Sequence, residues 1–319
     1  MEKIKLAIGF IVYGQTTAKY LPRFVPSLLA AEATVGLEAR FLVLDNQAAD
    51  DSNSRYLAEH LPDAEVFAAE TNLGFARGFN RLIQSALDRG DDFLLAVNPD
   101  TVWQESAIKY LLAALMLNDR AGSATPKVLS WDFATDQLTT TIDTCGLVAG
   151  RGLNFFDLAQ GQPDQGQCDN VKIIGPSGCA ALYRLAALAS VGFVGQYFDE
   201  LMFMYKEDVD LALRLRLAGW SAELVPQAIV WHDRSVSRRP GWLARLKSMR
   251  GKSDLVKYWS LKHQLILVYK YWRRQGSAAG LAILADCAAR LLYAALFDWP
   301  QLKAVREFWQ IRKKIVRPR

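Results

Sequence analysis

The stretch from residue 197 to residue 213 carries five carboxylates among large apolar and aromatic residues. They belong to Asp199, Glu200, Glu207, Asp208 and Asp210. Carboxylates held against apolar walls can have shifted pKa values, and such sites are candidates for proton transfer. The structural alternative is a helix start, because acidic side chains stabilise a helix N-terminus. We expect both: a helix that begins near Asp208, with its acidic first turn facing a cleft.

The first hundred residues must form a scaffold of alternating strands and helices. Apolar, β-branched runs indicate buried parallel strands, and apolar residues spaced three and four apart indicate helices. The predicted strands are Ile4–Val12, Ala39–Leu44, Glu65–Ala68 and Asp92–Val97. The predicted helices are Lys19–Ala31, Ser52–His60 and Ala76–Asp88. This order predicts an α/β fold with a doubly wound, mostly parallel sheet.

Two of these strands run directly into acidic residues, Asp45 and Asp100. Ligands of such sheets bind outside the carboxyl ends of the strands. We therefore expect the chemistry at this edge. Farther along, residues 132–172 predict a long, partly irregular insertion. A tight turn at Gly175, an apolar strand and a second strand over Leu224–His232 follow.

Composition is that of an ordinary globular protein, with 51% hydrophobic residues in a chain of 319. The four cysteines stand far apart, which favours a reducing compartment over a disulfide framework. The N-terminal apolar run is too short for a signal peptide. We therefore expect a cytoplasmic protein.

Charge divides the chain into two regions. Residues 1–233 carry 18 Lys and Arg against 29 Asp and Glu, whereas residues 234–319 carry 20 against 4. We predict a catalytic domain over 1–235 and a basic, aromatic-rich, amphipathic helical region over 236–319. The longest charge-free run of the second region, Gln275–Ala285, is too short to span a bilayer. The region is typical of helices at an anionic membrane surface; docking on the domain and nucleic-acid binding are the alternatives.

Seven segments in order resemble an inverting family 2 glycosyltransferase of the GT-A fold, in the rhamnosyltransferase-like branch. They are Ile11-Val-Tyr, Val43-Leu-Asp-Asn46, Thr71-Asn-Leu-Gly-Phe-Ala-Arg-Gly-Phe-Asn80, Leu95-Ala-Val-Asn-Pro-Asp-Thr101, Gly175-Pro-Ser-Gly-Cys-Ala180, the pair Phe198-Asp-Glu200 and Met204-Tyr-Lys-Glu-Asp-Val-Asp-Leu211, and Val230-Trp-His232. The resemblance covers roughly residues 4–235. It implies a nucleoside-diphosphate sugar donor, dTDP-linked or UDP-linked.

The resemblance also implies roles for individual residues. Asp208 would be the catalytic base, with Glu207 beside it, and a divalent cation, Mg²⁺ or Mn²⁺, would bind Asp100 and His232. Asn98 replaces the first acid of the family's Asp-x-Asp motif, so the affinity for the cation is expected to be modest. The donor-binding residues would be Asp45, Asn72, Gly74, Arg77, Asn80, Asn98 and Asp100. Asp199 and Glu200 would position the acceptor or brace the loop.

These roles predict transfer of a sugar, rhamnose from dTDP-rhamnose, to a hydroxyl of a glycan or lipid-linked glycan in cell-surface polysaccharide synthesis. The basic C-terminal region favours a lipid-linked acceptor, at the inner face of the cell membrane, and no nucleic acid. The rival hypotheses are a galactofuranosyl or other hexosyl donor, and an inactive nucleotide-sugar-binding protein. The intact Glu207-Asp208 pair and Asp100 argue against the inactive protein.

Overall fold

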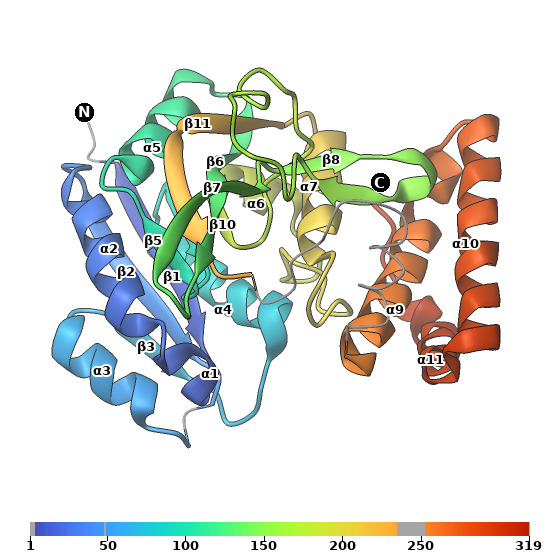
Figure 1. Ribbon diagram of the computed structural model, residues 1–319, viewed down its shortest axis with the longest axis horizontal. Coiled ribbons are helices and arrows are strands. Elements are labelled where there is room, and N and C mark those ends of the chain that lie inside the picture. The colour runs from blue at the N-terminus through green and yellow to red at the C-terminus, as the bar shows by residue number, and fades with distance from the viewer. Residues whose placement is uncertain (1–3, 48, 235–252, 319) are drawn as a thin grey trace.

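A nine-stranded mixed sheet forms the centre of the protein. The computed structural model describes residues 4–47, 49–234 and 253–318 (Figure 1). Eight strands follow the order β3-β2-β1-β4-β10-β6-β11-β5, and β7 pairs with β6. The strands are β1 (Lys5–Val12), β2 (Glu38–Asp45), β3 (Glu65–Ala68), β4 (Phe93–Val97), β5 (Thr101–Trp103), β6 (Ala121–Asp132), β7 (Gln137–Thr144), β10 (Ala180–Arg184) and β11 (Ser221–His232).

The pairing changes direction across the sheet. β3, β2, β1 and β4 are parallel, as the alternating sequence pattern predicts. β10 is antiparallel to β4 and β6, and β5 is antiparallel to β11, while β6 and β11 are again parallel. The sheet with helices on both faces confirms the α/β class predicted from the sequence.

Helices cover both faces of the sheet. One hydrophobic core lies under α2 (Leu21–Ala33), α3 (Ser52–His60) and α5 (Ala107–Leu117). The other lies under α4 (Gly74–Asp88), α6 (Leu185–Val191) and α7 (Glu207–Leu217). A short helix, α1 (Gly14–Ala18), follows β1. The predicted insertion holds β7 and a small hairpin of β8 (Leu147–Ala149), η1 (Arg151–Leu153) and β9 (Phe155–Asp157).

The C-terminal helices gather at one end of the molecule beside α7, and α10 is the outermost (Figure 1). They are α9 (Asp254–Tyr271), η2 (Trp272–Arg274), α10 (Ser277–Phe297), η3 (Trp299–Gln301), α11 (Leu302–Ile311) and η4 (Arg312–Lys314). Ile266 and Leu267 of α9 share one hydrophobic core with Met202 and Val209 beside the acidic stretch. The boundary predicted at residue 235 stays a prediction, and residues 235–252 lie outside the described part of the chain.

Among the described residues, one helix is long and apolar enough to cross a membrane by length and composition: α10. The sequence prediction of a run too short to span a bilayer therefore needs correction. Asp286 and Arg290 interrupt the apolar run, but they lie one helical turn apart, and Arg290 Nε contacts Asp286 Oδ2 at 2.7 Å. The helix therefore continues through both charges. Only 11% of the most apolar 18-residue stretch of α10 is buried.

A buried ion cluster ties α9 to the start of α7. The ammonium of Lys270 lies 2.6 Å from Asp199 Oδ2 and 2.7 Å from Asp210 Oδ1, and Arg214 Nε lies 2.9 Å from Asp210 Oδ2. The hydroxyl of Tyr271 also donates to Asp210 Oδ1, at 2.8 Å. Burial raises the pKa of Asp210, but Lys270 and Arg214 outweigh burial and hold that pKa at about 2. Asp210 therefore stays ionised at neutral pH.

Lys270→Met should lower the free energy of unfolding by about 3–5 kcal/mol, because it leaves Asp199 buried without its cation and Asp210 with Arg214 alone. Urea unfolding measures the change. Arg55→Met is the matched control, since Arg55 pairs with Asp51 on the surface and such pairs contribute about 1 kcal/mol or less. Equal losses for the two variants would show that the cluster does not tie the helices together.

Candidate active site

The acidic pair of the sequence motif lies at the N-terminus of α7, as predicted. Tyr205 and Lys206 immediately before it adopt left-handed backbone, with φ of 68° and 72°. Two consecutive non-glycine residues with left-handed backbone angles store strain. Such strain clusters at functional sites, where the surrounding structure holds the backbone in place. Phe203 is fixed from the other side, because its carbonyl accepts a hydrogen bond from Phe75 N–H at 2.9 Å. This tight turn brings Asp208 to the wall of the cleft.

Asp208 has the environment of a general base. Its Oδ2 accepts a hydrogen bond from the Gly178 N–H at 3.1 Å, and its Oδ1 accepts one from the Val209 N–H at 2.8 Å. Burial raises the pKa of Asp208 to about 6 despite these bonds. Burial and the neighbouring Asp208 raise the pKa of Glu207 well above its ordinary value. A carboxylate with a pKa near 6 is ionised at neutral pH and still basic enough to take a proton.

A cleft of about 500 Å³ opens in front of Asp208. Its lining also includes Asn98 and Asp100, from the turn between β4 and β5, and His232, the last residue of β11. The structure therefore brings the predicted base and the predicted cation ligands to one cleft. Val256 and Ser260 of α9 also line it. The C-terminal region thus supplies part of the wall.

Asp100 and His232 can hold a divalent cation. Asp100 Oδ1 is buried, has no hydrogen-bond partner among the described residues, and lies 3.4 Å from His232 Nε2. An unpaired buried carboxylate oxygen is costly, and a hard cation such as Mg²⁺ or Mn²⁺ prefers oxygen ligands. Burial lowers the pKa of His232, but Asp100 and Asp143 outweigh burial and raise it to about 10. Binding of a cation would displace that proton.

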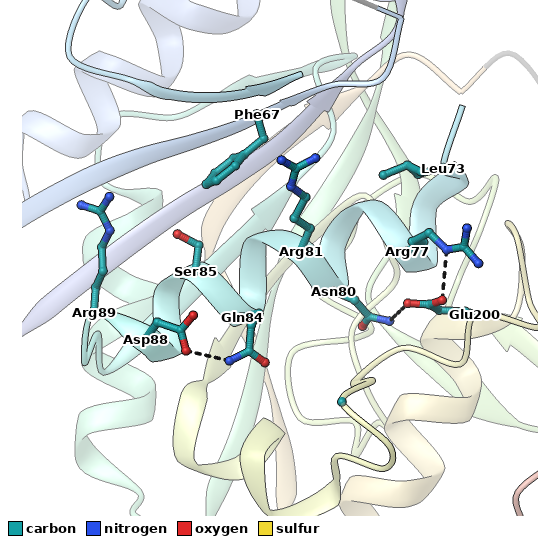
Figure 2. A pocket seen from close by; sticks show the side chains of 11 residues that line it. Phe67, Leu73, Arg77, Asn80, Arg81, Gln84, Ser85, Asp88, Arg89 and Glu200 are labelled. Atoms are coloured by element: carbon teal, nitrogen blue, oxygen red, sulfur yellow. Dashed lines mark hydrogen bonds and ion pairs between the residues drawn. The ribbon is translucent and has the colours of Figure 1, made fainter. Parts of the chain in front are cut away.

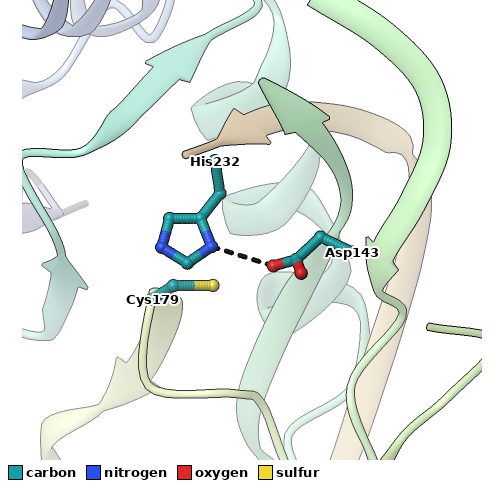
Figure 3. A group of neighbouring side chains, drawn as sticks. All are labelled: Asp143, Cys179 and His232. Atoms are coloured by element: carbon teal, nitrogen blue, oxygen red, sulfur yellow. Dashed lines mark hydrogen bonds and ion pairs between the residues drawn. The ribbon is translucent and has the colours of Figure 1, made fainter. Parts of the chain in front are cut away.

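A second arrangement, Asp143, Cys179 and His232, also places three possible ligands within 4.8 Å of one another (Figure 3). Its groups are already engaged. Asp143 Oδ2 contacts His232 Nδ1 at 2.8 Å, and Asp143 Oδ1 contacts Arg234 at 3.0 Å. Burial raises the pKa of the Cys179 thiol, which keeps it protonated. The contacts therefore give Asp143 the role of orienting His232, whose Nε2 faces Asp100.

Arg234 is a site residue that the sequence interpretation missed. It contacts Asp143 and, at 2.8 Å, Asp157 of β9, and it lines the cleft with Asp208. Its positive charge lowers the pKa of Asp208 and so offsets part of the rise that burial causes. One signal was available in the sequence: Arg234 follows His232 by two residues, so an extended chain would place both on the same side. Asp143 and Asp157 gave no such signal, because they lie in the predicted irregular insertion.

Asp45, Asn72 and Gly74 form a loop network away from the base. Asp45 ends β2, is buried and accepts a hydrogen bond from Gln47 N–H at 3.1 Å, and burial raises its pKa. Asn72 Oδ1 accepts hydrogen bonds from the Gly74 N–H and from Asn46 Nδ2, both at 2.8 Å. Gly74 has φ of 71°, and a Cβ there would meet the Phe203 ring at 2.6 Å. Their donor-binding roles stay predictions.

Arg77 and Asn80, predicted to bind the donor, lie on α4 along a separate groove of about 640 Å³ (Figure 2). Arg77 Nε contacts Glu200 Oε2 at 3.0 Å. Asn80 donates to the Phe198 carbonyl at 2.9 Å and to Glu200 Oε1 at 3.2 Å, and its Oδ1 accepts from the Tyr197 N–H. These contacts brace the chain that leads to the acidic pair. Neither residue lines the cleft of Asp208.

Asp199 and Glu200 likewise make bracing contacts. Asp199 is buried in the cluster with Lys270, and Glu200 bonds to Arg77 and Asn80. Neither lines the cleft of Asp208. Of the two alternatives expected from the sequence, bracing of the loop is the one that these contacts favour.

Comparisons with known proteins found a matching family model, a curated relative and structures of the same fold. A family model described as glycosyltransferase like family 2 matches residues 9–250. The N-acetylglucosaminyl-diphospho-decaprenol L-rhamnosyltransferase of Mycobacterium tuberculosis, in strains CDC 1551 and H37Rv, is 31% identical over 234 residues, which are 68% of this chain and 73% of that protein.

Two solved structures share the fold. GalNAc-T7 with UDP, GalNAc and Mn²⁺ is 14% identical with a TM-score of 0.59, over 85% of this chain and 48% of that chain. The mannosyltransferase PcManGT from Pyrobaculum calidifontis, in complex with GDP-Man and Mn²⁺, is 13% identical with a TM-score of 0.55, over 98% and 76%. At these identities the likeness concerns the fold.

Asp143→Asn should weaken Mn²⁺ binding about 10–100-fold, because an outer partner fixes the orientation and tautomer of a histidine ligand. Calorimetric titration of the full chain with Mn²⁺ and UDP measures the affinity. Asp169→Asn is the control, since Asp169 pairs with Lys127 outside the cleft. Unchanged Mn²⁺ affinity in a folded Asp143→Asn variant would refute the orienting role.

Proposed function

Because the chain belongs to glycosyltransferase family 2, we propose that it transfers rhamnose from dTDP-rhamnose to a hydroxyl of a lipid-linked glycan, with inversion at the anomeric carbon. The observation that carries this proposal is Asp208, whose pKa of about 6 suits a base and which lines one cleft together with Asn98, Asp100 and His232. The rhamnosyltransferase from Mycobacterium tuberculosis, whose acceptor is a diphospho-decaprenol, supports the choice of donor and acceptor class.

In the proposed reaction, the Asp208 carboxylate takes the proton of the acceptor hydroxyl. The hydroxyl oxygen attacks the anomeric carbon from the side opposite the diphosphate, the bond from that carbon to the diphosphate oxygen breaks, and nucleoside diphosphate leaves with the electron pair. A divalent cation bound to Asp100 and His232 would offset the negative charge of the diphosphate. The N–H groups of Gly178 and Val209 hold the Asp208 carboxylate in place, and burial sets its basicity.

The C-terminal region supports a place at the inner face of the cell membrane. The lipid of the acceptor would lie in the bilayer, and the basic excess of residues 234–319 suits an anionic leaflet. Val256 and Ser260 of α9 line the cleft, so this region would lie beside both the acceptor sugar and the lipid surface.

A donor screen tests the proposal. Release of nucleoside diphosphate is measured with dTDP-rhamnose, UDP-galactofuranose, UDP-GalNAc and GDP-mannose, each with Mn²⁺ and a polyprenyl-diphosphate-linked N-acetylglucosamine acceptor. The proposal expects acceptor-dependent release from dTDP-rhamnose above all others. Preference for another donor would overturn the rhamnosyl assignment, and no release from any donor would overturn the enzymatic one.

Asp208→Asn should lower turnover by about 10²–10⁴-fold, the usual contribution of a general base. Nucleotide affinity should stay within about twofold, because the side chain keeps its size and its amide oxygen can still accept one of the two backbone hydrogen bonds. Asp210→Asn is not a suitable control, since Asp210 belongs to the buried cluster. Asp169→Asn serves instead, because Asp169 pairs with Lys127 outside the cleft. Turnover of Asp208→Asn near that of the wild type would exclude Asp208 as the base.

The pH dependence follows from the raised pKa of Asp208. The base must be ionised, so kcat/KM should be constant above pH 7 and fall about tenfold per pH unit below about pH 6. Initial rates between pH 4.5 and 8.5 at saturating Mn²⁺ provide the measurement. A decline that begins only below pH 4 would mean that the base has the pKa of an ordinary solvated aspartate.

A further inference from the structure

α10 exposes a face without a single polar side chain. From Ala278 to Phe297, every exposed residue of this helix is alanine, leucine or phenylalanine. The large ones are 60–70% exposed: Leu281, Leu284, Leu292, Leu296 and Phe297. With the exposed alanines between them they recur every three or four residues, which places them in one stripe along the helix. A continuous apolar stripe of this length on a soluble surface marks an interaction site.

The two charges of α10 lie on the other side. Arg290 contacts Asp286 and also donates to Asn154 Oδ1 at 2.7 Å, in the loop between η1 and β9. Ile283 and Ala294 are buried against the rest of the protein. Both charges therefore face the domain and pair there. The outer face stays apolar from end to end.

Tryptophans and basic residues flank this outer face. Trp272 precedes α10 and Trp299 follows it, and their side chains are 42% and 72% exposed. Exposed basic residues accompany them in η2, α11 and η4: Arg273, Arg274, Lys303, Arg306, Lys313 and Lys314. Exposed tryptophans at both ends of an apolar segment, next to lysine and arginine, are typical of a membrane interface.

The basic excess beside α10 has no acidic counterpart within residues 253–318. The four acids of this described segment already pair inside it: Asp254 and Asp298 with Lys257, Asp286 with Arg290, and Glu307 with Lys262. A second copy of the chain on this face would bring two such positive surfaces together. An anionic bilayer instead offers apolar tails to the stripe and negative headgroups to its flanks.

We propose that the outer face of α10 inserts into the interfacial layer of an anionic bilayer, with the helix axis parallel to the membrane plane. α10 does not cross the bilayer in this arrangement, because its inner side stays packed on α9, η1 and α11. This inference deepens the proposed function and rests on it, since it names the surface on which a lipid-linked acceptor would be met.

Flotation of the full chain with vesicles tests the proposal without any sugar transfer. The wild type should float with vesicles of phosphatidylcholine and phosphatidylglycerol. The variant Leu284→Gln/Leu292→Gln should partition at least tenfold more weakly, because two apolar side chains no longer leave water. Leu117→Gln/Leu217→Gln is the matched control, with exposed leucines on α5 and α7, and should float like the wild type.

A second variant separates charge from insertion. Lys313→Gln/Lys314→Gln should bind the anionic vesicles more weakly than the wild type does. Added salt should also reduce the vesicle binding of this variant less than that of the wild type. Failure of the wild type to float, or equal flotation of Leu284→Gln/Leu292→Gln, overturns the proposal. The proposal is also overturned if the wild type forms a concentration-dependent dimer that only Leu284→Gln/Leu292→Gln abolishes. The outer face of α10 would then bind a second copy of the chain. Flotation with no activity on any donor would overturn the proposed function and leave this inference standing.

Discussion

A buried ammonium organises the catalytic end of this protein. Lys270 of α9 lies between Asp199 and Asp210, and these carboxylates flank the turn that carries Glu207 and Asp208. Charges in such surroundings persist only when they are fully paired, so α9 and the start of α7 cannot separate without a large cost. The left-handed turn at Tyr205 and Lys206 lies between Asp199 and Asp210 in the chain, and His263 of α9 contacts the Tyr205 carbonyl at 2.8 Å. The C-terminal helices are therefore part of the scaffold of the active site.

The same arrangement connects chemistry with location. α9 lines the cleft on one side and packs against α10 and α11 on the other. α10 in turn presents its apolar stripe to the outside. The predicted cation ligands Asp100 and His232, by contrast, come from the central sheet and line the same cleft as α9.

The sequence predicted those parts of the fold and site that depend on local periodicity. The strand end at Asp45 and a helix start near Asp208 follow from hydrophobic patterns and turn chemistry, whereas Asp100 lies in the turn between β4 and β5 and not at the end of β4 itself. The sequence pattern could not predict contacts between segments that are distant in the chain. Asn80 and Arg77 bond to residues more than a hundred positions away, so local spacing gave no reason to place them outside the cleft. Asp143 and the Asp286–Arg290 pair were missed because only the tertiary structure shows which way their side chains face.

The central claim is that Asp208 deprotonates an acceptor hydroxyl that displaces the diphosphate directly. The anomeric configuration of the product tests this claim, because a single displacement inverts the anomeric carbon. Proton NMR of the first product formed from an anomerically pure donor should show the configuration opposite to that of the donor. Retention of the donor configuration would contradict the account, since it requires two displacements or a different nucleophile.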